Sequence, residues 1–391
     1  MTIRFVEELP IEGRRTFIRV DFNVPLDGGR VSDDTRIRAA LPTIRHAVAR
    51  GARVILASHL GRPKGKVVPG LRLEPVGARL AELLEIDIIA ADDCVGDGPR
   101  KLASDLRDGQ VLLLENLRFH SGETANDPAF AAQLAELAEV YVNDAFGTAH
   151  RAHASTAGMV EHFENKGMGF LLRRELKHLG QLLEKPTRPF VAVLGGAKVS
   201  DKIGVVTALL GKADKVLIGG AMAYTFLKAR GVEVGASLVE DDRLRKAAEI
   251  LNKAAERKVE LLLPEDHLVA GSLDAASGQV SAPGIPPGQL GLDIGPATVD
   301  RYCQVIAAAR TVFWNGPMGV FEREPFAGGT VALARALAES GAVSVVGGGD
   351  SVAAIHQAGC ADKITHISTG GGASLEFIEG KRLPGLVALE Q

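Results

Sequence analysis

Cysteine is scarce in this sequence, and the spacing of its cysteines gives no sign of a disulfide framework or of a zinc site made of cysteine pairs. Only three cysteines occur among 391 residues, namely Cys94, Cys303 and Cys360. No two of them have the Cys-x-x-Cys spacing, so neither a disulfide framework nor a zinc site is indicated. Unpaired thiols suit a reducing compartment, and we therefore expect a cytoplasmic protein.

A surplus of positive charge and long apolar runs are also missing. The sequence has 45 Lys and Arg against 48 Asp and Glu, a net charge of −3, which argues against general nucleic-acid binding. No apolar run reaches membrane-spanning length, and the first residues lack the basic-then-apolar pattern of an export signal. The apolar content of 46% and charged content of 24% are ordinary for a soluble globular protein. We expect neither a nucleic-acid partner nor a membrane.

Two common phosphate-binding signatures are absent from the sequence. The pattern Gly-x-x-x-x-Gly-Lys-Ser/Thr does not occur, which excludes a P-loop kinase. No glycine-rich turn has the form Gly-x-Gly-x-x-Gly, which weakens the case for a dinucleotide-dependent dehydrogenase.

Glycine-rich turns are nevertheless present, and the clearest lies in residues 343–356. A β-branched apolar run ends at Gly347, Gly348 and Gly349, and small and apolar residues at helical spacing follow. This order predicts a strand, a turn and the start of a helix. Successive glycines allow a ligand to approach closely, and the first N–H groups of a helix attract an anion. Asp350 can cap this helix or bind a cation held by phosphates.

Four further segments of the second half have the same order of apolar run and small-residue turn. They are residues 191–202, 216–224, 312–319 and 364–374. In an open α/β sheet such turns all lie at the carboxyl edge of the strands, where ligands bind. The second half is therefore predicted to gather several phosphate-binding loops at one edge of a sheet.

Basic side chains follow the predicted strands of the first half. These strands are residues 17–20, 53–57, 111–114 and 140–142. The loops and helix starts behind them carry His59, Arg36, Arg62, Arg118 and Arg151. Guanidinium groups suit phosphate and carboxylate oxygens, so this half is predicted to bind a small anion in a basic pocket.

Strands and helices alternate in both halves, which predicts an α/β fold of two doubly wound, Rossmann-like parallel-sheet domains joined by a hinge helix. The predicted N-terminal domain covers residues 1–168, the connecting helix and linker residues 169–189, and the C-terminal domain residues 190–379. A tail of about residues 380–391 is expected to return to the N-terminal domain. Pro42 predicts a kink or a late start in the helix after residues 33–35. Residues 271–291 are predicted to form a surface hairpin and loop.

Eight short segments carry a resemblance to one known family. They are residues 19–25 (RVDFNVP), 58–65 (SHLGRPKG), 115–120 (ENLRFH), 143–151 (NDAFGTAHR), 194–203 (LGGAKVSDKI), 314–322 (WNGPMGVFE), 347–351 (GGGDS) and 368–374 (STGGGAS). In this order, and spread over both halves, they resemble the segments of the phosphoglycerate kinases. Residues 167–176 (GMGFLLRREL) follow the family's connector sequence only loosely, which concerns the expected hinge and not the expected sites.

The resemblance implies reversible, Mg²⁺-dependent phosphoryl transfer in glycolysis, from 1,3-bisphosphoglycerate to ADP, giving 3-phosphoglycerate and ATP, by a monomer. The implied phosphoglycerate-binding residues are Asp21, Phe22, Asn23, Arg36, His59, Leu60, Gly61, Arg62, Arg118 and Arg151. The implied nucleotide-binding residues are Lys202, Gly291, Asn315, Glu322, Gly348, Gly349, Asp350 and Ser351, with Asp350 contacting the metal. The expected catalytic residues are Arg36, Lys198, Lys202 and Gly371.

The residue types agree with this chemistry. Phosphoryl transfer requires in-line positioning and positive charge around the phosphoryl oxygens. Lys198 and Lys202 are four residues apart, so on a helix start they share one face, and Arg36 supplies a cation from the other half. No general base is required, because the acceptor is a carboxylate or a phosphate oxygen. We expect His59 to donate a hydrogen bond to a carboxylate.

A basic pocket in one domain and glycine turns in another must meet for direct transfer, which predicts hinge closure that excludes water. The alternative is a bilobal binding protein that senses an organic phosphate without chemistry. It explains two lobes and a pocket for anions, but it leaves Lys198, Asp350 and the triple-glycine turn at residues 370–372 without a role.

Overall fold

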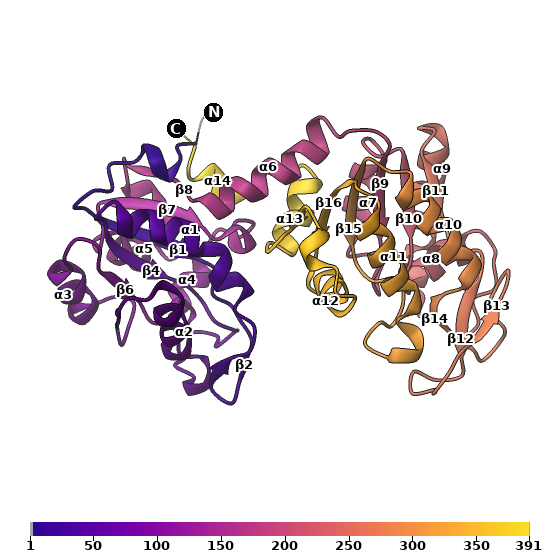
Figure 1. The fold of residues 1–391 in the computed structure, drawn as a ribbon, viewed down its shortest axis with the longest axis horizontal. Helices are drawn as coiled ribbons and strands as arrows, with labels where there is room; N and C mark the ends of the chain where they lie inside the picture. The colour runs from indigo at the N-terminus through magenta and orange to yellow at the C-terminus, as the bar shows by residue number, and fades with distance from the viewer. Residues whose placement is uncertain (1–2, 391) are drawn as a thin grey trace. The chain divides into compact units, whose positions relative to one another are not determined.

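The computed structural model describes residues 3–390, which form two compact units (Figure 1). The first unit comprises the chain up to Lys177 together with the segment that begins at Arg382. The second unit comprises His178–Lys381. No helix between residues 3 and 390 is long and apolar enough to cross a membrane.

A six-stranded parallel sheet forms the centre of the first unit. Its strands, in the spatial order β5-β6-β4-β1-β7-β8, are β5 (Ile88–Ala90), β6 (Val111–Leu113), β4 (Arg53–Ala57), β1 (Arg15–Val20), β7 (Val140–Asp144) and β8 (Lys166–Met168). The central strands are covered on both faces, and their sequences are therefore nearly continuous apolar runs. A short hairpin, β2 (Leu26–Asp27) with β3 (Arg30–Val31), follows β1.

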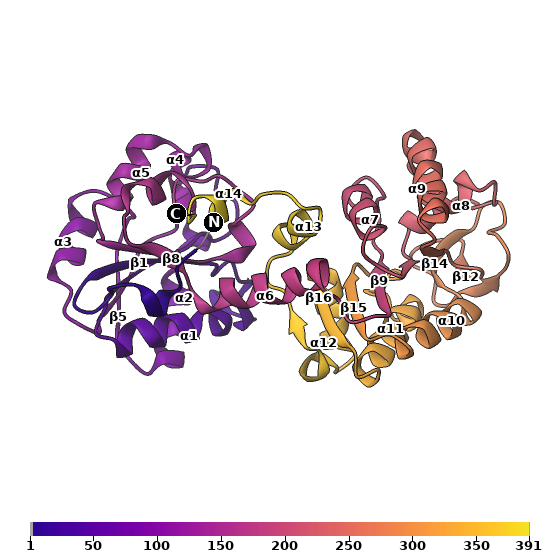
Figure 2. The same cartoon turned by 90° about the horizontal axis from the view of Figure 1, so that it is seen from above.

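Helices cover both faces of this sheet. They are α1 (Thr35–Ala49), α2 (Glu74–Leu84), α3 (Asp97–Asp105), α4 (Ser121–Ala125) and α5 (Pro128–Ala135), and α14 (Pro384–Val387) joins them from the end of the chain. Figure 2 shows α1 and α2 on one face and α4 and α5 on the other. The predicted late start of the first helix is wrong, because α1 begins at Thr35 and runs through Pro42.

A second six-stranded parallel sheet forms the centre of the other unit. Its order is β11-β10-β9-β15-β16-β17, with β11 (Glu260–Leu262), β10 (Lys215–Ile218), β9 (Phe190–Leu194), β15 (Thr311–Asn315), β16 (Val343–Gly347) and β17 (His366–Ile367). Its helices are α7 (Ile203–Leu209), α8 (Met222–Ala229), α9 (Leu244–Glu256), α10 (Pro296–Ala307), α11 (Gly328–Glu339), α12 (Gly349–Gln357) and α13 (Gly372–Ile378). The first three lie on one face, and α10, α11 and α12 lie on the other (Figure 2). The predicted fold of two doubly wound parallel-sheet domains is confirmed.

An antiparallel sheet of three strands also belongs to the second unit. Its order is β13-β12-β14, with β12 (His267–Ala270), β13 (Gln279–Ser281) and β14 (Leu290–Ile294). The hairpin predicted for residues 271–291 is therefore incomplete, since that range leaves out β12 and most of β14. β12 has only four residues and carries no strong period-two pattern, so its pairing with β14 is a long-range effect.

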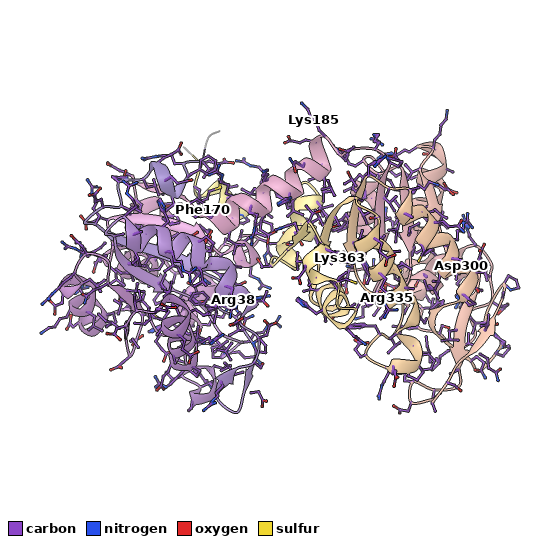
Figure 3. The ribbon with its side chains drawn as sticks, in the orientation of Figure 1. Arg38, Phe170, Lys185, Asp300, Arg335 and Lys363 are labelled. Atoms are coloured by element: carbon purple, nitrogen blue, oxygen red, sulfur yellow. The ribbon has the colours of Figure 1, made fainter. Side chains whose placement is uncertain are left out.

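The helix α6 (Phe170–Glu184) runs through the division between the units. Figure 3 labels Phe170 at its first residue and Lys185 just past its last. Two first-unit side chains accept hydrogen bonds from its first turn: Thr43 Oγ1 from the Phe170 N–H at 2.9 Å and Asp144 Oδ1 from the Leu172 N–H at 3.1 Å. Because Thr43 lies in α1 and Asp144 ends β7, these contacts cap the start of α6 on a helix and a strand of the first unit.

Candidate functional site

The predicted phosphoglycerate residues follow four strands of the first sheet. Because all these strands are parallel, their ends lie at one edge of the sheet. Residues 21–23 follow β1, residues 59–62 follow β4, Arg118 follows β6 and Arg151 follows β7, while Arg36 lies in the first turn of α1.

Hydrogen bonds join the segments after β1, β4 and β6. Arg36 Nη1 lies 3.0 Å from Oδ2 of the buried Asp21, and about a third of the Arg36 side chain (36%) remains exposed. Asn23 Oδ1 accepts the Gly61 N–H at 2.9 Å, and the Gly61 carbonyl accepts Arg118 Nη1 at 2.8 Å. The structure thus brings five of the predicted residues into one connected group.

The guanidinium of Arg118 lies among other cations. Burial, together with the positive charges of Arg19 and Arg151, lowers its pKa to about 10. Its Nε is buried and has no hydrogen-bond partner among the described residues. A buried, unsatisfied donor beside like charges is an arrangement that an anionic ligand would complete.

His59 is a neutral hydrogen-bond donor in this arrangement. Its Nδ1 lies 3.3 Å from Nη2 of Arg19, and a guanidinium can only donate, so Nδ1 accepts and Nε2 carries the proton. Burial lowers the pKa of His59 well below 6.5, and the charge of Arg19 lowers it further. A neutral donor next to a fixed cation suits a carboxylate or phosphate ligand.

The other predicted residues of this unit differ in exposure. Arg62 and Arg151 are exposed, and Arg151 Nε donates to His150 Nε2 at 3.2 Å. Phe22 is buried, and its N–H donates to Ser58 Oγ at 2.8 Å. Leu60 is buried, and its N–H donates to Asn116 Oδ1 at 3.2 Å. Phe22 and Leu60 therefore hold the loops after β1 and β4 in place from the interior, whereas Arg62 and Arg151 are exposed to solvent.

In the second unit, the turns after β9, β10 and β15 are joined backbone to backbone. The Gly195 N–H donates to the Asn315 carbonyl at 3.0 Å, and the Gly196 N–H to the Pro317 carbonyl at 3.0 Å. The Gly220 N–H donates to the Met318 carbonyl at 2.8 Å. A Cβ on Gly195 would lie 2.0 Å from the Pro317 carbonyl oxygen, so this close approach requires glycine.

The start of α12 is joined to the turn after β15. Asn315 Nδ2 donates to the Gly347 carbonyl at 2.7 Å, and the Gly316 N–H donates to Oγ of the buried Ser351 at 2.5 Å. Gly348 is the N-cap residue with φ +92°, so Asp350 lies in the first helical turn and is not the cap. Its side chain is exposed at the positive end of the helix.

Lys198 and Lys202 lie in turns before α7, which corrects the prediction that they share a helix face. The helix begins at Ile203, with Lys202 as its N-cap residue. Lys198 is exposed, whereas burial lowers the pKa of Lys202 to about 8, with Asp201 and Asp350 acting in the opposite direction. Lys202 Nζ lies 3.5 Å from the Asn315 carbonyl oxygen. The two lysines therefore have different environments.

Three more predicted residues of this unit lie on separate elements. Gly291 is in β14, where its N–H donates to Ser237 Oγ at 2.9 Å. Gly371 is the N-cap residue of α13 with φ +43°. Glu322 is exposed in the turn that follows residues 314–321.

Comparisons with known proteins agree with this geometry. The sequence matches the phosphoglycerate kinase family over residues 6–381. The chain belongs to the phosphoglycerate kinase family. It is 62% identical to the phosphoglycerate kinase of Anaeromyxobacter dehalogenans (strain 2CP-1 / ATCC BAA-258), with 100% of both chains covered. It is 57% identical to that of Chlorobium phaeobacteroides (strain BS1), with 98% of each covered.

Solved phosphoglycerate kinases have the same fold. The structure of the Coxiella burnetii protein superposes with a TM-score of 0.89 at 42% identity, covering 99% of each chain. That from Pyrococcus horikoshii OT3 superposes with a TM-score of 0.86 at 35% identity, covering 99% of this chain and 98% of the other. As a member of the phosphoglycerate kinase family, the protein is a glycolytic phosphotransferase that uses a nucleotide and small-molecule substrates.

A buried polar group behind His59 escaped the sequence analysis. Arg19 is fully buried, its Nε donates to Ser155 Oγ at 2.8 Å, and Ser155 Oγ donates to Glu123 Oε1 at 2.6 Å. Arg19 Nη2 lies 3.8 Å from Glu123 Oε1, and both side chains are inaccessible to solvent. The only signal in the sequence was an arginine within the apolar run 17–20, whose partners lie far along the chain.

Proposed function

We propose that this protein catalyses the transfer of a phosphoryl group between 1,3-bisphosphoglycerate and ADP, with 3-phosphoglycerate and ATP on the other side of the equilibrium. One observation supports this most. Hydrogen-bonded loops that carry Arg36 and Arg118 follow the strands of one sheet, whereas glycine turns that are hydrogen-bonded to one another follow the strands of the other. The first suits a small, highly charged acid, and the second suits the phosphates of a nucleotide.

In the first unit, we assign the phosphoglycerate to Asp21, Asn23, His59, Arg62, Arg118 and Arg151, with Arg36. His59 would donate through Nε2 to a carboxylate or phosphate oxygen, because Arg19 occupies Nδ1. The unsatisfied Nε of Arg118 would donate to the same ligand. Phe22, Leu60 and Gly61 would support the loops that carry these groups.

In the second unit, we assign the nucleotide to Lys202, Gly291, Asn315, Glu322 and residues 348–351. The exposed carboxylate of Asp350 offers the hard oxygen ligand that Mg²⁺ prefers, so it would hold the ion that accompanies the phosphates. When bound, Mg²⁺ supplies positive charge at the phosphate oxygens.

Catalysis would depend on positioning and positive charge. Arg36, Lys198, Lys202 and the N–H groups near Gly371 would stabilise the transferring phosphoryl group. No side chain needs to remove a proton, because the acceptor oxygen is already ionised. Closure about α6 would bring the two ligands together and exclude water, which limits hydrolysis. We further propose a cytoplasmic monomer without a nucleic-acid partner.

A coupled assay of ATP formation from ADP and 1,3-bisphosphoglycerate tests this function. The purified protein should form ATP only when Mg²⁺ and both substrates are present. A binding protein with the same fold would bind the two ligands in equilibrium dialysis and form no ATP, and that result would refute the proposed reaction.

A further inference from the structure

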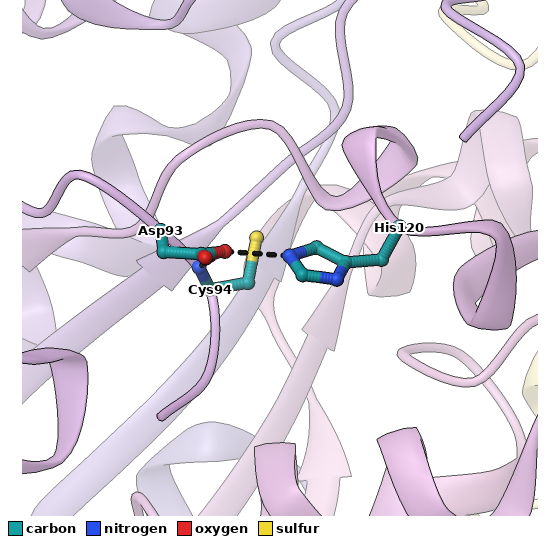
Figure 4. A group of neighbouring side chains, drawn as sticks. All are labelled: Asp93, Cys94 and His120. Carbon is teal, nitrogen blue, oxygen red and sulfur yellow. Dashed lines mark hydrogen bonds and ion pairs between the residues drawn. The ribbon is translucent and has the colours of Figure 1, made fainter. Parts of the chain in front are cut away.

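Three side chains with metal-binding atoms meet in the first unit outside the residues assigned above. Asp93 and Cys94 lie in the loop between β5 and α3, and His120 directly precedes α4. His120 Nε2 donates to Asp93 Oδ1 at 2.5 Å, and the Cys94 N–H donates to the same oxygen at 2.6 Å. In Figure 4 the three side chains point toward one another. We name them the Asp93–Cys94–His120 cluster.

The donor atoms of the cluster have the composition of a zinc site and lie close together. One sulfur, one nitrogen and one carboxylate oxygen all lie within 4.8 Å of one another. A tetrahedral zinc ion requires ligand atoms about 3.4–3.8 Å apart, given bond lengths near 2.0–2.3 Å. The Asp93 and His120 atoms, at 2.5 Å, must therefore separate by about 1 Å. The Asp93 side chain is half exposed (51%), so it has room to rotate.

The electrostatic surroundings of Cys94 favour a cation. Its thiol is buried and donates to the Glu115 carbonyl at 3.0 Å. Burial raises the pKa of this thiol well above 9, and the negative charges of Asp93, Glu123 and Glu115 raise it further, with Arg19 opposing them. The carboxylates that disfavour a bare thiolate attract a metal ion, which in turn deprotonates the sulfur.

The histidine of the cluster is fixed in orientation and open to solvent. Its ring stacks on Phe130, with centroids 5.0 Å apart and planes inclined by 25°. It also lines a cavity of about 330 Å³ together with Ser121, Asp127 and Gln133. The His120 and Asp93 side chains are partly exposed (31% and 51%), so an ion can reach them from solvent, whereas the Cys94 sulfur is buried.

We propose that Asp93, Cys94 and His120 bind one Zn²⁺ ion, with water at the fourth position. On binding, the thiol releases its proton to solvent, and the imidazole proton moves from Nε2 to Nδ1, which frees Nε2 for the metal. Because a proton is released, the affinity rises with pH. This site is independent of the proposed phosphoryl transfer.

Titration of the full-length, nucleotide-free protein with Co²⁺ tests the site. Cobalt replaces zinc in such sites and gives a sulfur-to-metal charge-transfer absorption only when a thiolate is bound. The wild type should bind one equivalent with this absorption, and Zn²⁺ should displace it. Asp93→Asn and His120→Gln should each weaken binding by at least about tenfold. Cys94→Ser should abolish the absorption.

Matched controls separate the cluster from adventitious binding. Asp92→Asn, Cys303→Ser and His356→Gln change residues of the same types outside the cluster and should leave the titration unchanged. If Cys94→Ser does not fold, the Asp93 and His120 variants still decide the matter, since both residues are partly exposed. No charge-transfer absorption in the wild type, or equal losses in the controls, would overturn the proposal.

Discussion

At the scale of residues, buried partners determine what the side chains of the candidate site can do. Arg19 sets the tautomer of His59, and Asp21 orients Arg36. Lys198 and Lys202 lie in the same turn region, yet Lys198 is exposed and Lys202 is half-buried. The chemical character of each group therefore follows from its neighbours in space.

Replacing Arg36 tests the role of the cation that pairs with Asp21. Arg36→Ala should lower turnover on the order of 10³-fold, because a cation at the transferring group would be lost. The Kd for ADP, measured by calorimetry, should stay nearly unchanged, since the nucleotide is assigned to the other unit.

Arg38→Ala is the matched control on the same helix. Arg38 lies two residues after Arg36 in α1. It is exposed, and its Nε lies 2.8 Å from Asp34 Oδ1. Its removal should leave turnover near the wild-type value. Wild-type turnover in Arg36→Ala would show that Arg36 serves at most in binding.

The lowered pKa of Lys202 predicts a pH dependence of nucleotide binding. Its pKa in the folded protein is about 8, so the side chain is positive below that pH and neutral above it. As the pH rises through about 8, attraction to the phosphates is lost, and the Kd for ADP should increase by roughly tenfold in the fully deprotonated form. Lys202→Gln should remove this dependence, while Lys198→Gln should retain it. An identical pH profile in Lys202→Gln would contradict the assignment.

At the scale of elements, the loops that follow the strands lie at one edge of the sheet in both units, but different groups join these loops to one another. In the first unit, side chains of Asn23 and Arg118 join the loops. In the second unit, backbone groups of the glycine turns bond directly to one another. Backbone contact at this distance leaves no room for a Cβ, so the second site depends on glycine itself.

Two glycines that flank α8 separate backbone strain from steric conflict. Gly220 has φ +65°, and a Cβ there would lie 2.5 Å from the Gly196 nitrogen. Gly231 has φ +81°, and a Cβ there would have nothing within 4 Å. Gly231→Ala should cost about 1–2 kcal/mol of unfolding free energy from its left-handed backbone alone. Gly220→Ala should cost about 3 kcal/mol and also weaken ADP binding, because the neighbouring turn must move.

Chemical denaturation and calorimetry measure these two effects. Equal stability losses and unchanged ADP affinity in both variants would mean that the turns after β9 and β10 do not act as one unit.

At the scale of the whole molecule, the proposed reaction requires a change in the arrangement of the two units. We expect the radius of gyration from small-angle X-ray scattering to decrease when 3-phosphoglycerate and Mg²⁺-ADP are both bound. This pair occupies both sites without turnover, so it reports closure alone. Either ligand by itself serves as the control. A radius that does not change with both ligands would argue against closure.

The sequence by itself determined the fold class and predicted the sheet edges at which the candidate site residues lie. Apolar runs such as those of β9 and β15, and the glycines behind them, are local signals of strands and turns. Arg36, His59 and Arg118 were predicted as site residues in this way, because each follows or lies close to a strand end. Local signals also predicted a helix after residues 33–35, but the late start inferred from Pro42 was wrong, because α1 begins at Thr35.

Only the tertiary structure decided which distant side chains meet. The order β5-β6-β4-β1-β7-β8 brings Arg19, Glu123 and Ser155 together behind His59, and it brings Asp93 and Cys94 to His120. The pairing of β12 with β14 and the burial of Lys202 arose in the same way. The physical reason is that the spacing of apolar residues in the sequence shows which face of a helix or strand is buried. The order in which the chain connects the strands determines what that face contacts.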